Sequence, residues 1–98
     1  MKMVLMVVND TRREELEVAL EEAGVTGYTE LPHAAGLGST GPRLGSRAFP
    51  RTSAVIFTFV PDAALGGLRE KLRDFCAASG ERLRLVAWDA EELGAPAP

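Results

Sequence analysis

The chain has 98 residues, the size of one compact domain, so two independently cored domains are not expected. Hydrophobic residues make up 46% and charged residues 26% of the sequence, which is the composition of a folded globular protein rather than a disordered chain. Eleven basic residues against 14 acidic ones give a formal net charge of −3. This balance argues against nucleic acid or an anionic membrane as a partner.

Cysteine and histidine occur once each, so the chain can form no internal disulfide and cannot supply four such ligands to a zinc ion. A lone cysteine suits a reducing compartment. The apolar run nearest the N-terminus, residues 3–8, is too short for a transmembrane helix or for the core of a signal peptide. We therefore expect a soluble, cytoplasmic protein.

The first part of the chain predicts a strand, a helix and a second strand. Residues 3–8 form a continuous apolar run, which is typical of a strand buried on both faces. Residues 11–23 repeat apolar side chains at helical spacing, with Thr11 placed to cap the helix and Gly24 placed to end it. Residues 26–31 are more polar and predict an edge strand.

The second part predicts a strand, a helix and a strand. Residues 53–60 are rich in β-branched and aromatic side chains, and Pro61 ends this strand. A helix follows from residue 62 to residue 80, with an apolar stripe along one side. Residues 83–88 predict the fourth strand, and residues 90–93 predict one helical turn.

The order βαββαβ predicts an α+β, ferredoxin-like fold, in which two helices cover one face of a four-stranded antiparallel sheet. We assign residues 1–93 to a single domain and residues 94–98 to a flexible tail. Two helices cover only one sheet face, yet the first and third strands are apolar at consecutive positions. A partner subunit is therefore expected on the other face.

The connection between the second and third strands, residues 32–52, is much longer than a hairpin requires. It has about 20 residues, with four glycines and three prolines and no signal for a helix or strand. Three of the eleven basic residues lie in it and no acidic one, which leaves the rest of the chain with eight basic and 14 acidic residues. The alternative to a functional loop is a solvated one kept soluble by its arginines. Because arginine suits phosphate and carboxylate groups, we favour an anion-binding loop carrying Arg43, Arg47 and Arg51.

Within this loop, residues 36–41 match the pattern G-x-G-x-x-G. A dinucleotide fingerprint must open a helix, and Pro42, Gly45 and Pro50 deny one here, so a Rossmann site is rejected. The glycines still let backbone amides approach an anion closely. The candidate ligand-binding residues of this segment are Gly36, Leu37, Gly38, Ser39, Thr40 and Gly41.

The other chemically reactive residues do not form a catalytic set, so no enzymatic activity is predicted. His33 is a weak metal-ligand candidate with no second ligand near it in the sequence, and Cys76 lies on the apolar stripe of the second helix as an inert thiol. Neither the phosphate cradle of acylphosphatases nor the aromatic motif of RNA-recognition domains is present.

Three segments together resemble the PII-like signalling proteins over residues 2–88. They are a first strand ending at Asn9-Asp10, a helix ending in Ala23-Gly24-Val25, and Gly36-Leu37-Gly38 at the start of the long loop. The resemblance is to a divergent member, because Ser39-Thr40 replace the Arg-Gln that follows this glycine segment in the family.

The resemblance implies a homotrimer of ferredoxin-like subunits that binds a small anionic effector, such as an adenine nucleotide, in clefts between subunits. It also implies that the long loop engages a target enzyme or transporter. Arg82 and Arg84 follow Ser79-Gly80-Glu81, which stands in place of the family's glycine-rich phosphate loop, and so join the candidate ligand-binding residues. Two alternatives stay open: a CutA-like protein that binds divalent metal, and an ACT-like module that binds an amino acid.

Overall fold

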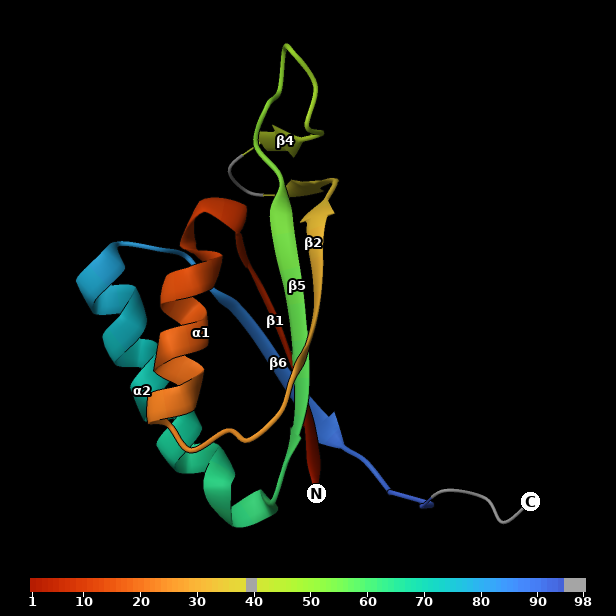
Figure 1. Cartoon of the computed structure of the whole chain (residues 1–98), viewed down its shortest axis with the longest axis vertical. Helices are drawn as coiled ribbons and strands as arrows, with labels where there is room; N and C mark the ends of the chain where they lie inside the picture. Colours follow the sequence, from red (N-terminus) through yellow and green to blue (C-terminus); the bar gives the residue numbers. More distant parts are fainter. Residues whose placement is uncertain (39–40, 95–98) are drawn as a thin grey trace.

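The computed structural model of the protein describes residues 1–38 and 41–94. Four strands form an antiparallel sheet in the order β2-β5-β1-β6, and a second, two-stranded sheet pairs β3 with β4. Helices α1 and α2 lie on one face of the larger sheet, and the segment between β2 and β5 projects from one end (Figure 1). The predicted α+β ferredoxin-like fold is confirmed.

The two central strands are the apolar ones that the sequence predicts. β1 (Lys2–Asn9) and β5 (Ser53–Val60) pair along their whole lengths, from Lys2 opposite Val60 to Asn9 opposite Ser53. The edge strands are β6 (Arg84–Asp89), beside β1, and β2 (Thr29–Ala34), beside β5. The most apolar strands therefore occupy the positions with neighbours on both sides.

Each helix follows a short 3-10 turn. The turn Asp10–Arg12 leads into α1 (Arg13–Glu22), and the turn Asp62–Ala64 leads into α2 (Leu65–Ser79). Thr11 does not cap α1 as predicted; instead the side chain of Asn9 accepts a hydrogen bond from the Thr11 amide at 3.3 Å. Asn9, the last residue of β1, therefore caps the 3-10 turn Asp10–Arg12, and this turn begins before the position that the spacing suggested.

Gly24 ends α1 as predicted. Its φ of 85° lies in the left-handed region, and the amide of Val25 donates to the carbonyl of Leu20 at 3.0 Å. This bond satisfies a carbonyl of the last helical turn and folds Val25 back onto the core.

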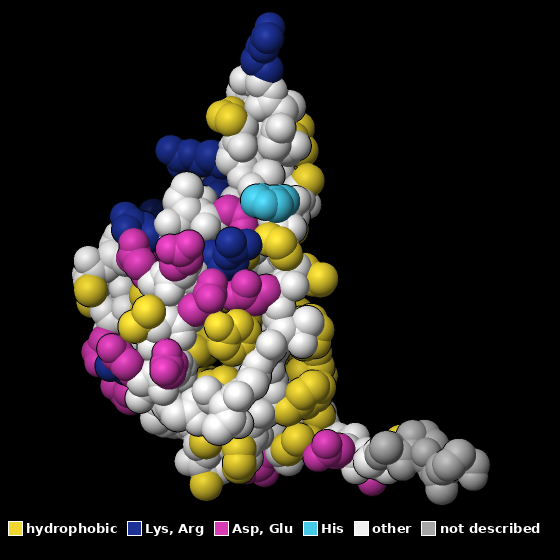
Figure 2. Space-filling view, viewed as in Figure 1, with side chains coloured by type: hydrophobic (Ala, Val, Ile, Leu, Met, Phe, Trp, Pro, Cys, Tyr) yellow, Lys and Arg dark blue, Asp and Glu magenta, His cyan; other side chains and the backbone are white. Residues whose placement is uncertain are grey.

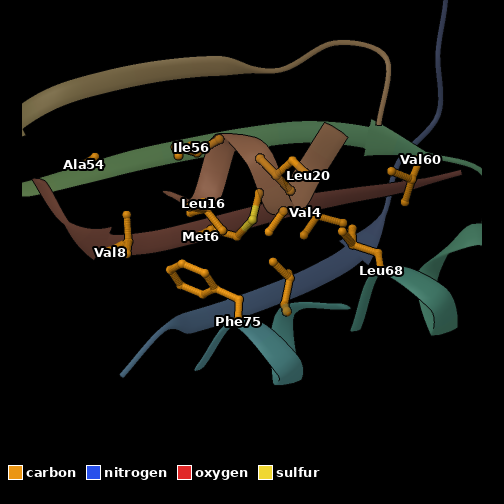
Figure 3. Close-up of a cluster of buried hydrophobic side chains, with 12 residues drawn as sticks. Val4, Met6, Val8, Leu16, Leu20, Ala54, Ile56, Val60, Leu68 and Phe75 are labelled. Atoms are coloured by element: carbon orange, nitrogen blue, oxygen red, sulfur yellow. The ribbon is translucent and has the colours of Figure 1, made fainter. Parts of the chain in front are cut away.

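The core lies between the helices and the covered sheet face (Figure 3). Alternate residues of β1 and β5 point into it, as the period of two in a strand requires. Its largest fully buried side chains are Met6, Leu16, Leu20, Ile56, Leu72, Val4 and Val8.

The opposite sheet face is apolar and has no helix over it. Leu5 on β1 lies between Phe57 on β5 and Val86 on β6, and Met3 lies between Phe59 and Trp88. Figure 2 shows hydrophobic side chains along the strand side of the molecule, while acidic ones gather over the helices. We call this surface the open face; its apolar residues are Met3, Leu5, Val7, Leu31, Val55, Phe57, Phe59, Val86 and Trp88.

The second strand lies three residues later than predicted, at 29–34 rather than 26–31. The predicted strand ended before Pro32, but an edge strand tolerates proline because one side of it needs no hydrogen bonds. A register shift between Leu31 and Ala34 accommodates the change in backbone direction there.

Two further predictions are wrong. The long connection is not free of strands, since β3 (Gly36–Gly38) pairs with β4 (Gly41–Arg43). Glycine and proline are depleted in strands, so the glycine- and proline-rich segments of β3 and β4 give no sequence signal for a strand. Residues 90–93 form no helical turn. The Ala90 amide donates to the Met1 carbonyl instead, and Leu93 is 87% exposed, so burial does not stabilise a turn there.

Among the described residues, no helix is long and apolar enough to cross a membrane.

Candidate functional site

An open cleft of about 680 Å³ lies at the end of the sheet from which the long connection leaves. Three parts of the chain form it: the end of β1, the long connection together with the start of β5, and the connection between α2 and β6 together with the start of β6. These parts are far apart in sequence, and the antiparallel topology brings them to one end of the sheet.

Four arginines line this cleft, which we call the arginine cleft. Arg43 and Arg51 come from the long connection, and Arg82 and Arg84 come from the segment after α2. Glu81 is the one acidic residue that lines it, so the lining has a formal charge of +3 on a chain whose net charge is −3. A concave site of this charge favours phosphate and carboxylate ligands.

Arg43 is held in place by the protein itself. Its Nε donates to Ser53 Oγ at 2.9 Å, and its Nη2 donates to the carbonyl of Thr52 at 2.9 Å. The side chain therefore ties β4 to the start of β5, and part of its hydrogen-bonding capacity is already used. Arg51, Arg82 and Arg84 make no ion pair with a described acidic residue.

The end of α2 determines where Glu81 and Arg82 lie. Gly80 has a φ of 72°, a conformation that glycine adopts without penalty, and its amide donates to the Cys76 carbonyl at 2.9 Å. The chain then turns toward β1, where Glu81 Oε1 accepts a hydrogen bond from the Asn9 amide at 3.3 Å. This bond joins the connection after α2 to the end of β1 at the cleft wall.

The outer end of the long connection is an ordered turn. The Ser46 amide donates to the Phe49 carbonyl at 3.0 Å, and the Phe49 amide donates back to Ser46 Oγ at 3.1 Å. Arg47 lies inside this turn, and Figure 2 shows a basic side chain at the outermost end of the molecule. Arg47 does not line the arginine cleft.

The structure brings seven of the candidate ligand-binding residues together. Gly41 and Arg47 do not line the cleft, and Ser39 and Thr40 lie outside the described residues. Asn9, Ser53 and Glu81 also line the cleft, and no sequence signal beyond their places at element ends marked them as site residues. The seven residues that line the cleft are Gly36, Leu37, Gly38, Arg43, Arg51, Arg82 and Arg84.

His33 faces one carboxylate. Its Nδ1 lies 3.4 Å from Asp10 Oδ2, and the imidazole is 77% exposed. Over residues 1–38 and 41–94, no three histidine, cysteine, aspartate or glutamate side chains gather in a way that would hold a metal ion.

Comparison with known proteins identifies the family. Residues 1–82 match the model of the nitrogen regulatory protein P-II family, and the chain belongs to this family. Comparison with curated proteins gives no match.

Three solved structures are similar in fold. A nitrogen regulatory PII-like protein from Thiomonas intermedia K12, bound to ADP, AMP and bicarbonate, is 25% identical, with a TM-score of 0.69 over 89% of this chain and 84% of that one. A putative PII-like signalling protein from Thermus thermophilus has 15% identity and a TM-score of 0.68 over 89% and 83% of the two chains. A DUF3240 family protein from Shewanella baltica OS155 has 14% identity and a TM-score of 0.69 over 98% and 97%.

Proposed function

We propose that this P-II family member is a regulatory protein without catalytic activity that binds a small anionic effector in the arginine cleft. The observation that carries the proposal is the convergence of Arg51, Arg82 and Arg84, from two separate segments, on one cleft. Adenine nucleotides are the first effector to consider, because the similar Thiomonas protein is bound to ADP and AMP. Their phosphates match the charge of the cleft.

We further propose that the protein is a homotrimer in which the open face is buried between subunits. An apolar face of this extent is unusual on a soluble monomer. Val7, Val55 and Arg84 belong to this face and also line the cleft. A second copy docked there would border the cleft, so the effector would lie between subunits.

The long connection is proposed to carry the signal to a target enzyme or transporter. It holds cleft residues at its base and Arg47 in an ordered turn at its tip. A ligand that contacts the base therefore acts on the same segment that presents the tip.

Calorimetric titration with ADP, AMP, ATP and sodium bicarbonate tests the effector class. The double variant Arg82→Gln, Arg84→Gln should weaken nucleotide binding at least about tenfold, with the difference shrinking as salt rises. The double variant Arg69→Gln, Arg73→Gln is the matched control, because it removes the same charge from exposed positions of α2. An equal loss of nucleotide affinity in both double variants would show that net charge, rather than the arginine cleft, governs binding.

Further titrations, with a divalent metal salt and with free amino acids, separate the two alternatives. Binding of divalent metal without any anion would favour the CutA-like function, and binding of a free amino acid alone would favour the ACT-like one. Thermal unfolding adds an independent readout, since a ligand that binds only the folded state raises its stability.

A further inference from the structure

The side chain of Asp10 connects the two ends of the long connection. The His33 amide, at the end of β2, donates to Asp10 Oδ2 at 3.0 Å. The hydroxyl of Thr52, directly before β5, donates to the same oxygen. The Asp10 amide in turn donates to the Thr52 carbonyl at 3.2 Å, so one residue after β1 holds both ends of the connection.

His33 has a backbone conformation that requires such a contact. Its φ of 58° lies in the left-handed region, and it is the one non-glycine residue described with a positive φ. This conformation is unfavourable for a side chain with a Cβ and persists where neighbouring contacts enforce it. The bond from the His33 amide to Asp10 is such a contact.

These contacts extend to the arginine cleft. The Thr52 carbonyl that accepts from the Asp10 amide also accepts from Arg43 Nη2 at 2.9 Å. The residues next to the three partners, Asn9, Ala34 and Ser53, line the cleft. Asp10 is therefore connected through Thr52 to Arg43 and lies next in sequence to a residue of the cleft wall.

One oxygen of the Asp10 carboxylate takes no part in these hydrogen bonds. Asp10 Oδ1 is buried but has no hydrogen-bond partner among the described residues, while the side chain as a whole is 14% exposed. A buried carboxylate oxygen without a donor is unfavourable, and opening of the connection would give it water.

We propose that Asp10 is a positioning residue, a latch that sets the closed shape of the long connection and, through it, the affinity of the arginine cleft. The part that concerns affinity rests on the proposed function of the cleft, whereas the part that concerns shape does not.

Amide hydrogen exchange in the ligand-free protein tests the latch directly. Thr52→Val removes one donor to Asp10 and keeps the side-chain shape, and Thr52→Ser keeps the donor. We expect the His33 amide to exchange about tenfold faster in Thr52→Val and at the wild-type rate in Thr52→Ser. Asp10→Ala should give a larger acceleration. The Phe49 amide, which is bonded to Ser46 Oγ at the tip, should not change in any variant.

Calorimetry with ADP supplies the second readout. Thr52→Val should weaken ADP binding several-fold and Thr52→Ser should not, although Thr52 itself does not line the cleft. If wild-type protein binds no ADP, the proposed ligand class fails while the exchange rates still decide the latch. The latch would be overturned if the His33 amide exchanges at the wild-type rate in Thr52→Val and that variant unfolds at the wild-type midpoint. This outcome decides the question even if Asp10→Ala does not fold.

Discussion

Leu5 of β1 lies directly opposite Phe57 of β5, on the sheet face that neither helix covers. Because the register places Val86 on the other side of Leu5, these three side chains form the middle of an apolar surface. A charge placed at this point would be buried without a partner in any assembly that uses the open face.

Phe57→Glu is therefore predicted to give a monomer, and wild-type protein a trimer. Light scattering after gel filtration measures the mass directly. The control is Val18→Glu, since Val18 is a 54% exposed apolar residue on α1, on the opposite side of the sheet. Wild-type protein that is monomeric at micromolar concentration would contradict the trimer and its explanation of the open face.

The central part of the fold was predictable because its signals are local. Val4, Met6 and Val8 lie in an unbroken apolar run, and such a run fits a strand with neighbours on both sides. Gly24 and Gly80 marked the helix ends because a left-handed residue after a helix has a strong glycine preference. Each of these predictions needs information from a few adjacent residues only.

The edge strand and the latch were not predictable in the same way. Pro32 stands inside β2, which is possible only because β2 is at the sheet edge, and the sequence does not give strand order directly. The contacts of Asp10 with His33 and Thr52 join residues 23 and 42 positions apart. No periodicity or spacing rule connects such positions.

The arginine cleft was predictable in part. Excess positive charge in the long connection pointed to an anion, and Arg43 and Arg51 do line the cleft. Arg47 shares their spacing in sequence but lies in the tip turn, because the Leu44 and Ser46 amides donate to the Phe49 carbonyl and fold the connection back on itself around Arg47. Charge counting identifies a basic segment, and the backbone path decides which of its side chains meet.

Arg47 and Arg51 are predicted to differ in function. Arg51→Gln should weaken ADP binding about tenfold, because it removes a cleft charge, while Arg47→Gln should leave affinity unchanged. Calorimetry at two salt concentrations measures both, and each variant serves as the charge-matched control for the other. Equal weakening by the two substitutions would show that the net charge of the connection, rather than the cleft, governs binding.

Cys76 is predicted to be structural. It is half-buried and packs against the core beside Phe75, and it does not line the cleft. A thiol reagent should label it more slowly in native protein than in urea. Cys76→Ala should lower the free energy of unfolding by about 1 kcal/mol without changing ADP affinity. Native labelling as fast as in urea would place the thiol outside the packed region.

Glu30→Gln is predicted to raise the stability of the protein at neutral pH. Burial raises the pKa of Glu30, and the nearby Glu17 carboxylate adds to this, while Arg13 acts in the opposite direction. The Glu30 side chain is 21% exposed, and Oε2 is 3.8 Å from Arg13 Nε. The glutamate is therefore held in a place that disfavours its charged form.

The raised pKa gives this prediction a pH signature. The folded protein binds the Glu30 proton more tightly than the unfolded chain does. The free energy of unfolding of the wild-type protein should therefore increase as pH falls through the folded pKa toward the ordinary value of 4.5. Glu30→Gln lacks this contribution, so its advantage, less than about 1 kcal/mol at neutral pH, should disappear near pH 4.5. Urea unfolding at several pH values measures the difference, with Glu14→Gln, at an exposed position of α1, as control. If the advantage of Glu30→Gln stays constant over this range, titration of Glu30 is not its cause.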